Sequence, residues 1–135
     1  MNIESITNDI KLICVPAKSF PDGILDAHMH IHKLVANPEE RTFFGISRPE
    51  KDTIIYKAAV EEIYPGEAEK LNCETIILLK GNYVSTEINV FMSKPQIIGQ
   101  TFQKMLERTD LDPNGYCVEE YLNDKDVKCM IRLED

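Results

Sequence analysis

The sequence contains no tryptophan, no long apolar run and no cluster of lysines or arginines. A membrane-spanning helix needs about 18 or more consecutive apolar residues, so none is expected, and no apolar segment behind a basic start suggests a signal peptide. With a formal net charge of −8 and no basic run, the surface should repel nucleic acid and anionic membranes. We therefore expect a cytoplasmic, acidic protein with no direct nucleic-acid or membrane partner.

Cysteine is also scarce. The four cysteines stand at positions 14, 73, 117 and 129, and none forms a Cys-x-x-Cys pair. This pattern is typical of reduced, mostly buried thiols and does not indicate a disulfide framework or a zinc site.

The length of 135 residues is enough for one compact domain, which we expect to span residues 1–135. It is too short for a (β/α)8 barrel, which needs at least about 200 residues. This matters because "DGILDAHMHIHK" (22–33) contains the Asp-x-His-x-His pattern of metal-dependent barrel hydrolases.

The histidines of that segment allow two interpretations. On a strand, His28, His30 and His32 would share a face and could bind a metal ion. On a helix, His28 and His32 lie about 40° apart while His30 points elsewhere, so only two could share a metal. Apolar residues at 24, 27, 31, 34 and 35 follow helical spacing, so we favour the helix. Because the chain has no other histidine to complete a site, we expect no metal and no cofactor.

The apolar pattern and the turn residues predict two successive β-α-β-β units. The first is expected to have a strand at 10–15, a helix at about 22–36 and a hairpin of strands 41–47 and 52–62 around a turn at 48–51. A loop at 64–70 and a short strand at 74–79 follow. The second is expected to have a strand at 82–91, a helix at 96–108 and a hairpin of strands 116–122 and 127–133.

A constant shift of 74 residues aligns the two units without a gap. The identities fall at turns and at one buried helix position, and they pair Ser19 with Ser93, Pro21 with Pro95, Ile24 with Ile98, Lys51 with Lys125 and Asp52 with Asp126. We interpret this as an internal duplication, with pseudo-repeats at about 9–63 and 81–134. The predicted fold class is α+β, an antiparallel sheet with two helices on one face and a ligand cleft on the other.

Alternation along the last strands suggests which residues face that cleft. Val127, Cys129 and Ile131 are expected to face the helices together with Val118. The residues that alternate with them along each strand then point to the helix-free face. The shift of 74 carries Cys117 onto Phe43 and Met130 onto Tyr56. The helix-free face is therefore expected to carry Phe43, Tyr56, Cys117, Glu119, Tyr121 and Met130. An apolar and aromatic surface away from the helices indicates a bound ligand or partner.

Glu119 is the most informative member of this set. A carboxylate among aromatic side chains attracts cations through its charge and through the ring faces, and it favours lipophilic cations because they lose little hydration on entry. Its pKa should be raised by burial. The alternative is structural, with Glu119 hydrogen-bonded to a tyrosine. Tyr83, which follows the turn residues Gly81 and Asn82, also has a purely structural interpretation.

Four segments of the doubled β-α-β-β pattern resemble the GyrI-like small-molecule-binding domain, which is also the effector-binding domain of AraC- and MerR-type multidrug regulators. They are "FFGIS" (43–47), "IIYKAAVEE" (54–62), "LLKGNY" (78–83) and "CVEEYLND" (117–124), and the resemblance covers roughly residues 8–134. It implies a cleft between pseudo-symmetric halves in which a glutamate and aromatic neighbours bind lipophilic, often cationic compounds. Carried over by position, the glutamate is Glu119 and the neighbours are Tyr121, Tyr56 and Tyr83.

The sequence departs from this family in two respects. The family often has a helix tryptophan in the pocket, whereas here His28 or His32 stands near that place. The regulators also carry a DNA-binding domain that this sequence lacks, so transcriptional control would need a separate DNA-binding protein.

The resulting hypothesis is a stand-alone domain that binds hydrophobic, cationic small molecules as a sensor or sequestering protein, linked to transcription regulation or drug response. It is not expected to be an enzyme. Two alternatives follow from the same resemblance: a protein-binding module such as an inhibitor of DNA gyrase, or a small hydrolase that uses Glu119 and Tyr121 as acid and base.

Overall fold

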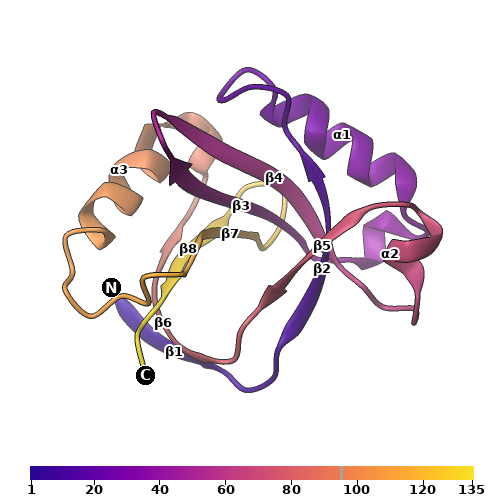
Figure 1. The fold of residues 1–135 in the computed structure, drawn as a ribbon. Helices are drawn as coiled ribbons and strands as arrows, with labels where there is room; N and C mark the ends of the chain where they lie inside the picture. The colour runs from indigo at the N-terminus through magenta and orange to yellow at the C-terminus, as the bar shows by residue number, and fades with distance from the viewer. Residues whose placement is uncertain (95) are drawn as a thin grey trace. The chain divides into compact units, whose positions relative to one another are not determined.

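The computed structural model describes residues 1–94 and 96–135, so Pro95, one of the positions matched in the repeat, lies outside the described residues. The chain divides into a first unit, residues 9–78, and a second unit, residues 1–8 and 79–135. Each unit combines an antiparallel sheet with a helix packed on it (Figure 1). The α+β fold class is thereby confirmed.

The first unit is built on a sheet with the strand order β3-β4-β2-β5. Its elements are β2 (Ile10–Pro16), α1 (Ile24–Leu34), β3 (Phe43–Glu50), β4 (Thr53–Glu61), α2 (Glu67–Lys70) and β5 (Glu74–Leu78), with a 3-10 turn η1 (Pro38–Glu40). Helix α1 lies over β2 and β4 (Figure 1), and it buries Ala27 and Ile31 at the helical spacing that the apolar pattern predicted.

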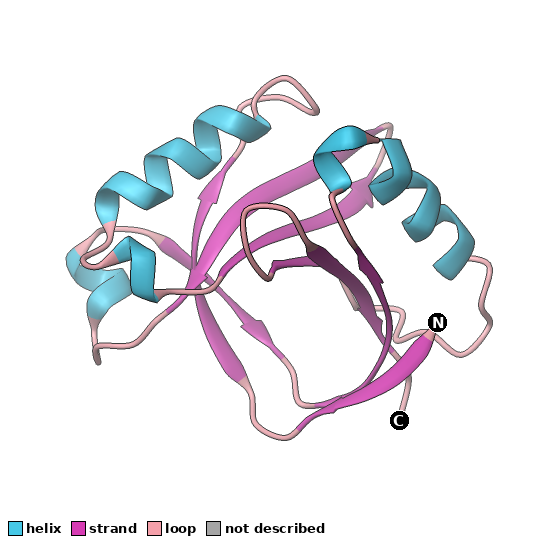
Figure 2. Cartoon of the chain, turned by 180° about the vertical axis from the view of Figure 1, so that it is seen from behind, coloured by secondary structure: helices cyan, strands magenta, loops and turns pink. Residues whose placement is uncertain are grey.

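The second unit is built on a sheet with the strand order β1-β6-β8-β7. Its elements are β1 (Asn2–Ile6), β6 (Gly81–Ile88), the 3-10 turn η2 (Phe91–Ser93), α3 (Gln96–Met105), β7 (Cys117–Tyr121) and β8 (Val127–Arg132). Helix α3 packs on β6 and β8 through Phe102 and Met105, and both ends of the chain belong to this unit (Figure 2).

The two units share one topology. In each, the first strand, helix and hairpin follow in the same order, and an additional strand, β5 or β1, pairs with the first strand, β2 or β6. The hairpins begin 74 residues apart at Phe43 and Cys117, in agreement with the alignment from sequence. A common origin of the units, and a single domain over residues 1–135, stay predictions.

Three elements differ from the prediction. Strand β1 was not predicted, because its only support is the tertiary pairing with β6. The loop at 64–70 contains the short helix α2. The first hairpin turns at Lys51 and Asp52 instead of 48–51, because Arg48 and Pro49 continue the pairing with β4 and Lys51 takes the positive φ of 56° that a tight turn needs.

The helices are short, with 11 residues in α1 and 10 in α3. Among the described residues, no helix has the length and apolar character needed to cross a membrane.

Candidate ligand-binding site

Glu119 lies in the middle of β7 and faces α3. In the register with β8, it stands opposite Cys129, and its neighbours on the same face, Cys117 and Tyr121, stand opposite Ile131 and Val127. Directly opposed residues of an antiparallel pair point to the same side of the sheet. Apart from Glu119, all these residues belong to, or pack against, one apolar core with Phe102 and Met105 of α3. The carboxyl group is therefore placed beside a hydrophobic core.

Burial dominates the electrostatics of this carboxyl group. Glu119 is 8% exposed, and the Tyr121 hydroxyl donates a hydrogen bond to its Oε1 at 2.5 Å. Desolvation raises the pKa of Glu119, and the hydrogen bond from Tyr121 offsets part of that rise. Among the described residues of the second unit, no lysine, arginine or histidine forms an ion pair with Glu119. A cation placed against it would therefore gain a buried counter-charge.

The side chains that surround Glu119 on this face are uncharged. Burial, and then the Glu119 charge, raise the pKa of Cys117 to about 11, and burial raises that of Cys129 to about 12. Both groups therefore stay neutral thiols and behave as small apolar side chains at neutral pH. The Tyr121 ring lies 5.9 Å from the Phe91 ring, centroid to centroid, in a tilted arrangement. This places one aromatic pair next to the carboxyl group.

Thr86 is a polar neighbour that sequence reasoning missed. It stands opposite Cys129 in the β6–β8 ladder, while Cys129 stands opposite Glu119, so the three side chains form a row on the α3-facing side. Thr86 Oγ1 is buried and has no hydrogen-bond partner among the described residues. Such a hydroxyl can donate to or accept from a ligand. The available signal was its place at a core-facing position of β6.

Tyr83 and Met130 lie on the other face of the same sheet. Tyr83 stands opposite Arg132, and Met130 stands opposite Val118, at the alternate ladder positions from Glu119. Tyr83 is 1% exposed, and its hydroxyl donates to the Leu79 carbonyl at 2.6 Å. Its immediate role is thus to hold the connection between β5 and β6.

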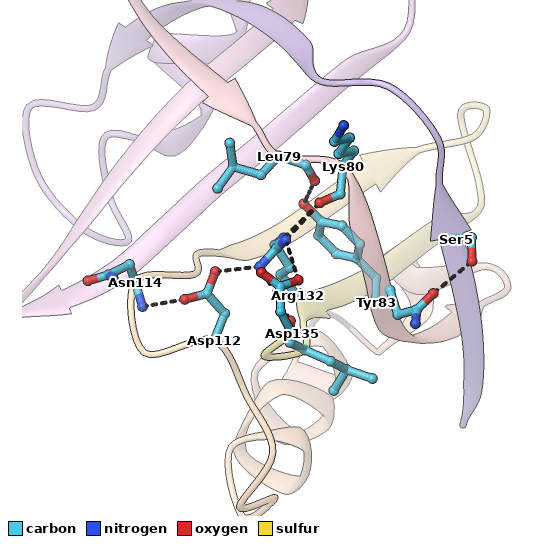
Figure 3. A network of polar contacts seen from close by, with 10 residues as sticks. Ser5, Leu79, Lys80, Tyr83, Asp112, Asn114, Arg132 and Asp135 are labelled. Carbon is cyan, nitrogen blue, oxygen red and sulfur yellow. Dashed lines mark hydrogen bonds and ion pairs between the residues drawn. The ribbon is translucent and has the colours of Figure 1, made fainter.

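Figure 3 shows Tyr83 beside a polar network centred on Arg132. The guanidinium donates to the Lys80 carbonyl through Nε and Nη2, at 3.0 and 2.8 Å, and forms ion pairs with Asp112 and Asp135, both at 3.0 Å. These contacts connect the turn before β6 with the loop before β7 and with the chain after β8. They give this face of the sheet a structural role.

Phe43 and Tyr56 belong to the first unit and face α1. The His32 ring stacks on Phe43 at a centroid distance of 3.7 Å and an angle of 9°. His28 Nε2 lies 2.8 Å from the Tyr56 hydroxyl oxygen. Burial, followed by the charge of His32, lowers the pKa of His28 to about 4, so the His28 ring is neutral at pH 7. The two histidines that border the apolar stripe of α1 therefore each hold an aromatic side chain of the sheet.

Gly45 makes room for this arrangement. A Cβ atom at position 45 would lie 2.1 Å from the Tyr56 hydroxyl oxygen, so no larger residue fits without moving Tyr56. Gly45 is the position that the shift of 74 aligns with Glu119. The first unit thus buries a tyrosine hydroxyl over a glycine where the second unit carries the carboxylate.

The assignment of the predicted site residues to the helix-free face is wrong. Phe43 and Tyr56 contact α1, and Cys117, Glu119 and Tyr121 lie on the α3-facing side. Both faces of β7 are buried, with Val118 at 0% and Cys117 at 9% exposed, so alternation could not decide between them. Of the residues predicted for the helix-free face, Met130 alone lies on the face away from α3.

The alignment of Met130 with Tyr56 by the shift of 74 is wrong for a separate reason. Ser47 and its partner Tyr56 have eight residues between them, 48–55, whereas the aligned residue Tyr121 and its partner Val127 have five, 122–126, which is three fewer. An odd difference in length exchanges the two faces of the returning strand. Since Ser47 and Tyr121 correspond, their partners Tyr56 and Val127 correspond as well.

The histidine segment forms helix α1, which confirms the helical interpretation. His28 and His32 contact aromatic rings, and His30 is exposed. Within the described residues, no group of three or more histidine, cysteine, aspartate or glutamate side chains is placed to hold a metal ion.

Comparison with solved structures extends over nearly the whole chain. The structure of SAV2435 bound to tetraphenylphosphonium matches with a TM-score of 0.66 at 13% identity, over 98% of this chain and 93% of that one. A protein from Staphylococcus aureus MU50, assigned to bacterial transcription regulation, matches at 0.64 and 13% identity, over 99% and 97%. A hydrolase from Listeria innocua matches at 0.56 and 12% identity, over 98% and 92%.

No protein-family model matches the sequence, and no curated protein matches it. At 12–13% identity these likenesses show the fold alone. The chain shares the fold of these structures, while the GyrI-like resemblance of its sequence motifs stays a prediction.

Proposed function

We propose that this protein binds hydrophobic, cationic small molecules and that Glu119 is the counter-charge for them. The observation that carries the proposal is the buried Glu119 carboxyl group, which has a raised pKa and no cationic partner among the described residues of its own unit. Burying a carboxyl group in this way lowers stability unless a bound cation compensates for it. The likeness to a structure that holds the lipophilic cation tetraphenylphosphonium supports the same ligand class.

The neighbours of Glu119 favour a lipophilic cation over a small hydrated one. Tyr121 and Phe91 offer ring faces and edges, and Cys117 and Cys129 offer neutral thiols. A delocalised organic cation loses little hydration on entry and gains apolar contacts, whereas an inorganic ion would lose its water shell. Tyr121 stays bonded to the carboxylate and keeps it oriented.

The role that fits this chemistry is sensing or sequestering such compounds in the cytoplasm. All four cysteines are free thiols, consistent with a reducing compartment. The likeness to a protein assigned to transcription regulation supports a regulatory role. Because the chain has a net charge of −8, regulation would act through a separate DNA-binding protein or another protein partner such as DNA gyrase.

The test is a fluorescence-polarisation titration of rhodamine 6G against wild type, Glu119→Gln and Glu120→Gln. Glu120 is the matched control, since it lies next in the chain but faces the other side of the sheet, opposite Lys128. Glu119→Gln should weaken binding by about 1.5–3 kcal/mol, the range for a charge-assisted contact. Glu120→Gln should leave binding within twofold. Equal binding to wild type and Glu119→Gln would refute the assignment of Glu119.

Hydrolysis is the second candidate function, favoured by the 2.5 Å Tyr121–Glu119 hydrogen bond and the likeness to a hydrolase. A carboxylate with a raised pKa can accept a proton from an attacking water, and a tyrosine can donate one to a leaving oxygen. A screen for ring opening of small epoxides would support it if Glu119→Gln and Tyr121→Phe both abolish turnover. Tight dye binding without any turnover would favour the binding function.

A further inference from the structure

A hollow of about 400 Å³ opens in the first unit beside α1, at the place where β2 leads into the turn before the helix. Val15 and Ala27, both buried, contribute to its apolar part, together with Met29, which is 49% exposed. Its volume is within the usual range for small-molecule sites, which is about 300–1,000 Å³. The hollow, which we call the α1 hollow, lies apart in sequence and in unit from Glu119.

The charged lining of the α1 hollow is mainly basic. Lys18 comes from the turn after β2, and Asp26, His30 and Lys33 come from one side of α1, at a spacing of four and three residues. None of these four side chains takes part in a hydrogen bond or an ion pair with any residue that the structure describes. In a chain with a net charge of −8, two unpaired ammonium groups against one carboxylate give this hollow a net positive lining.

We propose that the α1 hollow binds a small apolar anion, such as an aryl or alkyl carboxylate or sulfonate. Its hydrophobic body would lie against Val15, Ala27 and Met29, and the acid group would meet the ammonium groups of Lys18 and Lys33. The His30 ring offers an N–H donor in either tautomer. The site has the opposite charge preference to the Glu119 site, so one chain would bind two classes of compound.

Asp26 reduces the net positive charge of the α1 hollow. It is the single carboxylate among the lining residues, against two lysines, so the local balance still favours an anion. Replacing Asp26 by asparagine removes a like charge from the neighbourhood of the bound anion. Asp26→Asn should therefore tighten anion binding, and a weakening would contradict the proposal.

The experiment follows ¹⁵N-labelled protein by amide chemical shifts during titration with naphthalene-1-sulfonate. Residues around Val15, Gly23 and Ala27 should shift together and saturate. Lys18→Gln and Lys33→Gln should each weaken binding roughly threefold, and together about tenfold, as expected for solvent-exposed charge contacts. Lys70→Gln is the matched control, because Lys70 is exposed in α2 of the same unit and does not line the hollow.

Three results would overturn the proposal: shifts that map outside the α1 hollow, no saturable binding, or equal binding by the Lys18→Gln/Lys33→Gln double variant. Naphthalene-1-methylammonium, with the same ring and the opposite charge, must bind the hollow more weakly than the sulfonate. Glu119→Gln should leave sulfonate binding unchanged, so a failure of this proposal and a failure of the Glu119 proposal are separate outcomes.

Discussion

At the scale of single residues, the buried carboxyl group of Glu119 should lower stability in the absence of a ligand, if it has the binding role proposed above. The residue is 8% exposed, and it lies beside the core that includes Cys129 and Phe102. A glutamine would fill nearly the same volume without the cost of ionisation in that environment. Two consequences can be measured, one on the pH dependence of binding and one on stability.

Replacing Tyr121 by phenylalanine should shift the pH dependence of cation binding. The Tyr121 hydrogen bond lowers the pKa of Glu119, so its loss lets burial raise that pKa further. The cation needs the ionised carboxylate, so binding should need a higher pH, and affinity at pH 7 should fall by about 1 kcal/mol, the size of one hydrogen bond. Dye titrations between pH 5 and 9 would show the shift. Tyr64→Phe, at an exposed position, is the control, and an unchanged profile in Tyr121→Phe would contradict the account.

Replacing Glu119 by glutamine should raise the free energy of unfolding at neutral pH in the absence of ligand. The folded-state pKa of Glu119 is raised by burial, so the folded state binds more protons than the unfolded state between the two pKa values. Wild-type stability from this group therefore falls as the pH rises from the unfolded pKa through the folded one. A glutamine at position 119 does not titrate, so it contributes no such pH dependence to stability. Urea unfolding at pH 5 and pH 8 would show a larger gain for the variant at pH 8, and a loss there would mean that the carboxylate supports the fold.

At the scale of elements, helix α1 docks on its sheet through two histidine–aromatic contacts. His28 meets Tyr56 on β4, and His32 stacks on Phe43 of β3. Gly45 on β3 lies beneath the Tyr56 hydroxyl. The second unit has Phe102 at the position aligned with His28 and Glu119 at the position aligned with Gly45, so its helix meets an apolar surface beside a carboxyl group.

Replacing Gly45 by alanine should destabilise the protein by roughly 1–3 kcal/mol, the usual cost of overpacking. The added Cβ would lie 2.1 Å from the Tyr56 hydroxyl oxygen and 2.8 Å from the ring carbon that carries it. Gly99→Ala is the control, because nothing lies within 4 Å of a Cβ at that position of α3, and helix propensity should make it stabilising by up to about 1 kcal/mol. In urea unfolding, Tyr56→Phe should recover part of the loss in Gly45→Ala, and additive effects would contradict the steric cause.

Replacing Glu67 by glutamine should destabilise the first unit by about 3–5 kcal/mol, because it leaves the buried Arg41 charge without its carboxylate counter-charge. Arg41 binds both carboxylate oxygens of Glu67, and its side chain is 1% exposed. The Arg41 hydrogen bonds lower the pKa of Glu67, so this stabilisation is present above the unfolded pKa and is lost as the pH falls through the folded one. Glu69→Gln, which removes an exposed partner of Lys11, is the control and should leave thermal unfolding nearly unchanged.

At the scale of the whole molecule, the order of elements could be predicted from the sequence, but the faces of the strands could not. The period of Ala27 and Ile31 predicted α1, and the run Ile10–Val15 predicted β2, since these patterns are local. Val118 and Cys117 are both buried, so β7 carried no alternation that could show which side Glu119 occupies. The α1 hollow depends on tertiary packing and had no local signal. The position of Thr86 on β6 could be predicted, but not that its hydroxyl would lack a partner among the described residues.

The net charge of −8 offers a competing explanation for any cation binding, because an acidic surface attracts cations without a site. Raising the salt concentration distinguishes attraction by the acidic surface from binding at a specific site. At 0.5 M salt the Debye length is well under 10 Å, so the attraction of the surface is largely screened, whereas a buried contact is affected much less. Cation binding that depends on Glu119 should therefore persist at high salt.

The most direct test is calorimetric titration of tetraphenylphosphonium at pH 7 and 0.5 M salt. The account predicts that wild type binds and that Glu119→Gln binds at least about tenfold more weakly. Equally tight binding by wild type and Glu119→Gln would contradict it.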